Sequence, residues 1–169
     1  GKLDNSYVLA SETCALDIIG AKFIREVDNG EIVVVENNQI KSFKPFNKIK
    51  SRPCVFEYIY FARPDSILNG KCAYEYRKKL GEELAKESGI DADIIVPVPD
   101  SGVPAALGYS QSSKIKFELG LIRNHYVGRT FIEPTQNIRS FGVKLKLSST
   151  KSILKDKSII LIDDSLVRG

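Results

Sequence analysis

The chain has 169 residues, of which 43% are hydrophobic and 27% charged, a composition that can build a hydrophobic core and is typical of globular proteins. No apolar run approaches the length of a membrane-spanning helix and the N-terminus lacks the regions of a signal peptide, so we expect a cytoplasmic protein without a membrane partner. The net charge of +4 is mild, and no basic patch interleaved with aromatic residues is present, so we expect no nucleic-acid partner.

The first part of the chain predicts short strands around one helix. Residues 7–10 predict a strand that a short helix follows, and residues 31–35 predict a second strand after a turn at 28–30. Residues 36–53 are polar and basic, contain two prolines and have few apolar anchors. This composition is typical of a boundary between domains.

Beyond residue 53, strands and helices alternate. Residues 54–62 predict a strand because they are rich in aromatic and β-branched side chains, and residues 74–88 predict an amphipathic helix. The elements expected after them are a strand at 94–98, a helix at 103–110, a strand at 116–122, a polar loop at 126–142 and a strand at 158–162. This alternation predicts an α/β fold with a parallel sheet covered by helices.

Two of the predicted strands run directly into acidic loops of small residues. The first strand is followed by Asp100, Ser101 and Gly102, and the second by the sequence DDSLVRG at residues 163–169. In parallel α/β sheets, ligands bind at the carboxyl ends of the strands. We therefore expect both loops to face one crevice.

The composition of these loops suits a sugar phosphate. Asp163 and Asp164 are adjacent carboxylates that favour a divalent cation or sugar hydroxyls. The Ser, Arg and Gly residues that follow offer a hydroxyl, a positive charge and backbone N–H groups to a phosphate. The alternative is that the two aspartates only end a strand and cap a helix. Four aliphatic residues followed by DDSLVRG favour the functional interpretation.

Sequence similarity to a known family narrows this interpretation. The segment IILIDDSLVRG closely resembles the phosphoribosyl diphosphate (PRPP) signature of type I phosphoribosyltransferases. The segments CVFEYIYFARPDS, VPVPDSGVPAALGY and GLIRNHYVGRTFIEPTQNIRSFGVKLKL resemble the amidophosphoribosyltransferases, the glutamine-dependent enzymes that begin purine synthesis. SETCALDIIGAKFIREVDNGEI is similar to the last part of that family's glutaminase domain.

The resemblance implies a domain organisation and an activity. Residues 1–48 would be the C-terminal portion of an Ntn-hydrolase-type glutamine amidotransferase domain with its linker. Residues 49–169 would be the N-terminal portion of a type I phosphoribosyltransferase domain, an α/β fold with a parallel sheet and helices on both faces. The chain would then be an interior piece, inactive alone, of a homo-oligomeric enzyme, tetrameric in the family. That enzyme transfers ammonia from glutamine to PRPP, giving 5-phosphoribosylamine in the first committed step of purine biosynthesis.

The resemblance also implies roles for residues in the two loops. Asp100, Ser101 and Gly102 would hold the diphosphate of PRPP. Ser101, Asp163 and Asp164 would be associated with bound Mg²⁺, and the two carboxylates would also contact the ribose hydroxyls. The cradle for the 5-phosphate would begin with Ser165, Arg168 and Gly169.

Residues 124–139 resemble the family's mobile loop, which closes over PRPP and helps to form an ammonia channel. Tyr126 and Arg129 would contact the substrate, with Arg129 assisting catalysis, and Phe131 and Ile132 would line the channel. The alternative is an ordinary surface loop. His125, the only histidine, is expected to have no catalytic role.

The three cysteines show no CxxC spacing, which argues against a secreted disulfide framework. Cys54 lies where one branch of the family has a ligand of a [4Fe–4S] cluster, whereas Cys14 and Cys72 match none of the family's ligands. The alternative for Cys54 is a small core residue. Two other functions stay open, namely another type I phosphoribosyltransferase and a non-catalytic module that senses PRPP.

Overall fold

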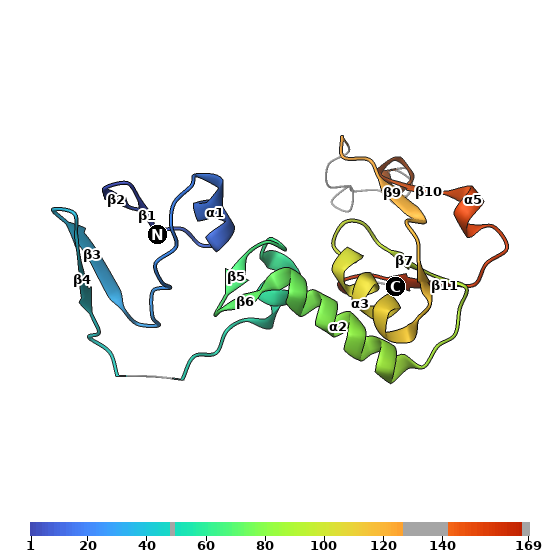
Figure 1. Ribbon diagram of the computed structural model, residues 1–169, viewed down its shortest axis with the longest axis horizontal. Helices are drawn as coiled ribbons and strands as arrows, with labels where there is room; N and C mark the ends of the chain where they lie inside the picture. The colour runs from blue at the N-terminus through green and yellow to red at the C-terminus, as the bar shows by residue number, and fades with distance from the viewer. Residues whose placement is uncertain (48–49, 127–141, 167–169) are drawn as a thin grey trace. The chain divides into compact units, whose positions relative to one another are not determined.

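The computed structural model describes residues 1–47, 50–126 and 142–166. The chain forms two compact units, Gly1–Tyr76 and Arg77–Gly169, and helix α2 continues from the first into the second (Figure 1). Each unit has its own sheets.

The first unit consists of short elements. They are β1 (Lys2–Leu3), β2 (Ser6–Tyr7), α1 (Thr13–Ile18), β3 (Ile32–Glu36), β4 (Gln39–Phe43), the π-helix η1 (Glu57–Phe61), β5 (Ile67–Leu68) and β6 (Lys71–Cys72). The strands form three antiparallel pairs, β1 with β2, β3 with β4 and β5 with β6. The predicted turn at 28–30 is confirmed, with Gly30 at a φ of 72°.

Strand β4 lies inside the segment that composition marked as a boundary. Its turn explains why it forms, because Asn37 and Asn38 have φ values of 50° and 59°. Two residues with positive φ make the tight turn that suits the twist of a hairpin, and asparagine tolerates this conformation. The polar segment therefore extends a hairpin from β3, with Val35 paired to Ile40.

The prediction of a strand at residues 54–62 is wrong, because Glu57–Phe61 in this segment form η1 instead. The backbone N–H of Ala62 donates to the Glu57 carbonyl at 3.1 Å, a bond five residues apart that a strand cannot make. Tyr58 is the buried residue of this turn, and its ring lies 4.8 Å from that of Tyr76. The aromatic residues suggested a strand, but one of them, Tyr58, packs inward from a helical turn.

Hydrogen bonds explain why the first unit extends to residue 76. The Glu12 carboxylate accepts from the Arg63 backbone N–H at 2.8 Å and from the Ser66 hydroxyl at 2.7 Å. Next to it, the Ile67 N–H donates to the Thr13 hydroxyl at 2.8 Å. The Ser66 bond, followed by that from Arg63, lowers the pKa of Glu12. Residues on both sides of position 48 are thus joined in one unit, and the domain boundary at 48 stays a prediction.

The second unit contains a parallel sheet. Its elements are α2 (Ala73–Ser88), β7 (Ile94–Pro97), α3 (Val103–Ser113), β8 (Lys116–Phe117), β9 (Leu121–Arg123), β10 (Leu147–Ser149), α5 (Lys151–Leu154) and β11 (Ile159–Ile162). The sheet order is β11-β7-β8, and both pairings are parallel. The predicted α/β fold with a helix-covered parallel sheet is confirmed. The single strand expected at 116–122 is instead two strands, and β9 pairs with β10, which the sequence did not predict.

The core of this unit lies between α3 and one face of the sheet. Ile95 and Ile162 pack there against Ala106 and Tyr109 of α3. Side chains alternate between the faces of a strand, so Val96 points to the other face. There it lies with Leu154 of α5 around Gly120. Helices therefore contribute to both faces of the sheet.

Helices α2 and α3 contact each other backbone to backbone. A Cβ at Gly81 would overlap the Ala105 carbonyl oxygen, and a Cβ at Gly108 would overlap the Lys78 carbonyl oxygen. Only glycine permits this approach at both positions. The contact fixes α3, and with it the loop at the end of β7.

Candidate substrate-binding site at two strand ends

The loops that follow β7 and β11 leave the same edge of the sheet. Ile162 is paired with Pro97, and one step further the Val98 N–H donates to the Ile162 carbonyl at 2.7 Å. Asp163 is the next residue after Ile162, so the second loop starts at this bond. The structure thus brings the two acidic loops side by side, as parallel pairing of their strands predicts.

Gly102 brings the start of α3 against the end of β11. A Cβ at residue 102 would overlap the Ile162 carbonyl oxygen and lie 3.0 Å from the Val98 oxygen. The Gly102 N–H donates to that Val98 oxygen at 2.9 Å, which closes the loop. Ser101, half-buried, is therefore held at the same edge as Asp163.

The N-terminus of α3 opens from this loop. Its N-cap residue is Gly102, so no N-cap side chain accepts from the first N–H groups of the helix. Pro104 lies in the first turn, where a helix tolerates proline. The N–H groups of Gly102 and Val103 already donate to the carbonyls of Val98 and Asp100. The helix dipole is therefore what favours an anion at this end.

The second loop has a chain of local hydrogen bonds. The Asp164 N–H donates to the Asp163 carboxylate at 2.8 Å, and the Ser165 hydroxyl donates to the Asp164 carboxylate at 2.6 Å. Although Asp163 as a residue is exposed, desolvation of its carboxyl group raises its pKa. The N–H bond from Asp164 opposes this rise, and the charge of Asp164 adds to it. A cation bound here would reduce the electrostatic repulsion between the two adjacent carboxylates.

Arg123 is a residue of this region that the sequence analysis missed. Its Nη1 donates to the Asp100 carboxylate at 2.6 Å, which joins the end of β9 to the loop after β7. The sequence signal that could have identified it was its place directly after the strand predicted at residues 116–122. Its partner, 23 residues away, could not be read from the sequence.

The donors at the two loops fit a magnesium ion that is held together with a phosphate ligand. Mg²⁺ is usually bound by one or two carboxylates plus substrate phosphates and water. Asp163 and Asp164 supply such carboxylates, and Ser101 supplies a hydroxyl. Within the described residues, no group of three or more His, Cys, Asp or Glu side chains could hold a metal alone.

Several predicted site residues lie outside the described residues. They are Arg129, Phe131, Ile132, Arg168 and Gly169. Of the neighbouring residues that are described, Tyr126 is 99% exposed, and its N–H donates to the Asn124 side chain at 3.0 Å. His125 is exposed as well. The roles of all these residues stay predictions.

The cysteines are free thiols in different environments. Cys14 is buried, Cys72 is half-buried and Cys54 is exposed. The exposure of Cys54 contradicts its interpretation as a core residue. A [4Fe–4S] cluster needs four thiolates as a rule, and the described part of the chain gathers no such set. Cys54 would supply one of these thiolates, and the cluster stays a prediction.

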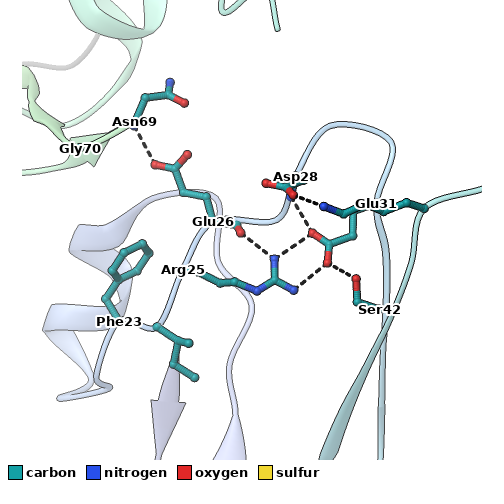
Figure 2. A pocket seen from close by; sticks show the side chains of 10 residues that line it. Phe23, Arg25, Glu26, Asp28, Glu31, Ser42, Asn69 and Gly70 are labelled. Carbon is teal, nitrogen blue, oxygen red and sulfur yellow. Dashed lines mark hydrogen bonds and ion pairs between the residues drawn. The ribbon is translucent and has the colours of Figure 1, made fainter. Parts of the chain in front are cut away.

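A hollow lies in the first unit, away from the strand-end loops, with a cavity volume of about 660 Å³. Figure 2 shows Arg25 facing Glu31, whose carboxylate also accepts from Ser42 and from the Asp28 N–H. The two Arg25 bonds measure 2.7 and 2.8 Å, and Lys44 pairs with Asp28. These charges neutralise one another, so we assign the cluster a structural role. Bonds from Arg25, Ser42 and Asp28, in that order, hold the pKa of Glu31 well below its usual range.

Comparison with known proteins shows which proteins this chain is similar to. No family model matches the chain. An amidophosphoribosyltransferase of Rhizobium etli is 58% identical over 174 residues, covering 100% of this chain and 35% of that protein. A Bacillus subtilis amidophosphoribosyltransferase is 46% identical over 100% of the chain and 36% of its own length. The chain belongs to the amidophosphoribosyltransferase family.

A solved structure agrees with this family assignment. The chain matches the glutamine PRPP amidotransferase of B. subtilis, complexed with ADP and GMP, with a TM-score of 0.84 and 46% identity. The match covers 94% of this chain and 35% of that one. The chain thus spans about a third of the length of the amidophosphoribosyltransferases it matches. A soybean amidophosphoribosyltransferase, 52% identical over 99% of the chain, is described as chloroplastic.

Proposed function

We propose that the protein carrying this chain transfers ammonia from glutamine to PRPP and forms 5-phosphoribosylamine, the first committed step of purine biosynthesis. One observation supports this most directly. Two acidic strand-end loops lie side by side at one sheet edge, in a chain that is 58% identical to an amidophosphoribosyltransferase.

We assign the parts of PRPP to the two loops by charge. The diphosphate would lie at Asp100–Gly102, where the N-terminus of α3 favours an anion. The ribose hydroxyls would be bound by Asp163 and Asp164, because carboxylates accept from hydroxyl groups. The 5-phosphate would meet the loop that begins at Ser165. Ser101, Asp163 and Asp164 would hold Mg²⁺, which when bound would offset the negative charge of the diphosphate.

In the proposed reaction, the nitrogen lone pair of ammonia forms a bond to the anomeric carbon of PRPP. The bond from that carbon to the diphosphate oxygen breaks, the diphosphate leaves with the electron pair, and the new ammonium group loses a proton. Positive charge develops on the ribose ring in the transition state. The carboxylates of Asp163 and Asp164 beside the ring would stabilise this charge, so the chain contributes mainly positioning and electrostatic stabilisation.

The ammonia would come from glutamine hydrolysed by an N-terminal cysteine, as the resemblance implies. Arg129 as a catalytic residue, and Phe131 and Ile132 as channel walls, stay part of this proposal. The [4Fe–4S] cluster and the homo-oligomer stay predictions as well.

A turnover assay on the full-length protein that carries this chain tests the proposal. With glutamine, Mg²⁺ and PRPP, we expect diphosphate and glutamate to appear in equal amounts. Diphosphate released only with a nucleobase would indicate another type I phosphoribosyltransferase. PRPP binding without turnover would indicate a sensing module.

The cellular location also stays a prediction. Among the described residues, no helix combines the length and the apolar character needed to cross a bilayer. Fractionation of cells that express the tagged full-length protein would test the cytoplasmic assignment.

A further inference from the structure

The backbone of Arg123 is fixed by a strand pairing. Arg123 is the last residue of β9 and is paired with Leu147 of β10. The next residue, Asn124, continues the ladder by donating its N–H to the Lys146 carbonyl at 2.8 Å. The side chain of Arg123 therefore starts from a well-anchored position, and what it contacts depends on its own rotamer.

That side chain reaches the loop after β7. Its Nη1 lies 2.6 Å from the Asp100 carboxylate, and the side chains of Arg123 and Asp100 are 34% and 57% exposed. Arg123 Nε is buried and has no acceptor among the described residues. Burying a donor without an acceptor is unfavourable. The guanidinium nevertheless stays at Asp100, so the ion pair determines where this side chain lies.

The charge of Asp100 explains why such a pair is needed. The two loops contain three carboxylates, those of Asp100, Asp163 and Asp164. In the proposed function, magnesium offsets the adjacent pair. Asp100 belongs to the loop assigned to the diphosphate, where an unpaired carboxylate would repel the incoming anion. Arg123 forms the ion pair with Asp100.

We propose that Arg123 is a positioning residue for PRPP binding. It neutralises the Asp100 carboxylate and holds it aside, so that the loop at 98–102 can receive the diphosphate. This inference rests on the proposed function and adds to it a residue that the PRPP signature does not contain. It predicts that the importance of Arg123 depends on the charge of Asp100.

The test compares variants of the full-length protein that carries this chain. Arg123→Gln should raise KM for Mg–PRPP about tenfold or more, as expected for the loss of a charged hydrogen bond, with a much smaller change in kcat. Arg123→Lys keeps the charge and should have an intermediate KM. In an Asp100→Asn background, Arg123→Gln should change KM by less than about threefold, because no carboxylate remains to be neutralised.

Controls separate this role from a structural one. Lys86→Gln breaks an exposed ion pair with Glu83, also 2.6 Å long, on α2 and should leave KM for Mg–PRPP unchanged. Calorimetric binding of Mg–PRPP and thermal unfolding accompany each variant. If Arg123→Gln does not fold, Arg123→Lys and the double variant still measure the dependence on Asp100.

Each outcome decides one point. Equal losses from Arg123→Gln with Asp100 present and with Asp100→Asn would show a structural role and overturn the inference. An unchanged KM in Arg123→Gln, with normal wild-type turnover, would also overturn it and leave the proposed function intact. A wild-type protein that neither binds nor converts PRPP would overturn the proposed function and the inference together.

Discussion

The α-carbon of Gly102 lies directly against the carbonyl oxygen of Ile162, which joins the start of α3 to the end of β11. A Cβ at residue 102 has no room there. We expect Gly102→Ala to displace the loop at 98–102 and to weaken Mg–PRPP binding. Overpacking of this kind costs about 1–3 kcal/mol. Calorimetric titration of the full-length protein with Mg–PRPP measures the loss. Gln111→Ala, at an exposed position on α3, is the control.

The contact between α2 and α3 predicts that two Gly→Ala substitutions destabilise the protein, although such substitutions in a helix usually stabilise it. Gly→Ala in a helix interior normally stabilises by about 0.5–1 kcal/mol. At Gly81 and Gly108, however, a Cβ would overlap backbone atoms of the neighbouring helix. We therefore expect Gly81→Ala and Gly108→Ala each to destabilise by about 1–3 kcal/mol. Thermal unfolding measures the sign, and a rise in Tm in either variant would contradict the observed helix contact.

The adjacent carboxylates predict a separation of the two half-reactions. Asp163→Asn and Asp164→Asn keep the side-chain shape and remove a charge that Mg²⁺ or the ribose hydroxyls would need. We expect weaker use of Mg–PRPP in both variants, with glutamine hydrolysis retained. Steady-state kinetics at limiting PRPP measure the loss. Unchanged kinetics in both variants would overturn the assignment of this loop to PRPP.

The raised pKa of Asp163 adds a pH dependence. Its carboxyl group stays protonated to a higher pH than an ordinary aspartate does, because desolvation disfavours the charged form. Since magnesium binding needs the carboxylate, Mg–PRPP affinity should fall as the pH falls through this raised pKa. Asp163→Asn should remove this dependence. Calorimetric titrations over a series of pH values, with Asp93→Asn at the opposite end of the strands as the control, measure it.

Glu31 predicts loss of stability in acid. Its side chain is 1% exposed and is bonded to Arg25, and its pKa in the folded state is lowered. A lowered pKa means that the carboxylate stabilises the fold fully above the ordinary glutamate pKa. The contribution is lost as the pH falls through the lowered folded value. Glu31→Gln should thus reduce Tm at neutral pH and flatten its fall in acid. Glu36→Gln, at an exposed ion pair, should change neither.

The sequence by itself determined the parallel sheet and the place of its acidic loops. Two short aliphatic runs, at residues 94–97 and 159–162, indicated strands of a parallel sheet. The structure shows β7 buried throughout, whereas β11 is an edge strand on which Ile159 and Leu161 are exposed. Parallel pairing then places both carboxyl ends at one edge. The residues after each run, among them Ser101 and Asp163, could be found for the same reason. The resemblance to a known family, which extends along nearly the whole chain, pointed to the same residues.

Only the tertiary structure decided which distant groups meet. Arg123 and Asp100, Gly81 and Ala105, and Gly102 and Ile162 lie far apart in the sequence. Their contacts depend on how helices and strands pack, and no local pattern records this. Residues 54–62 show the same limit, because their composition favoured a strand while Tyr58 packs inward from a helical turn. Local preference sets the periodicity of a segment, but the energy of packing against distant residues selects among the conformations that it permits.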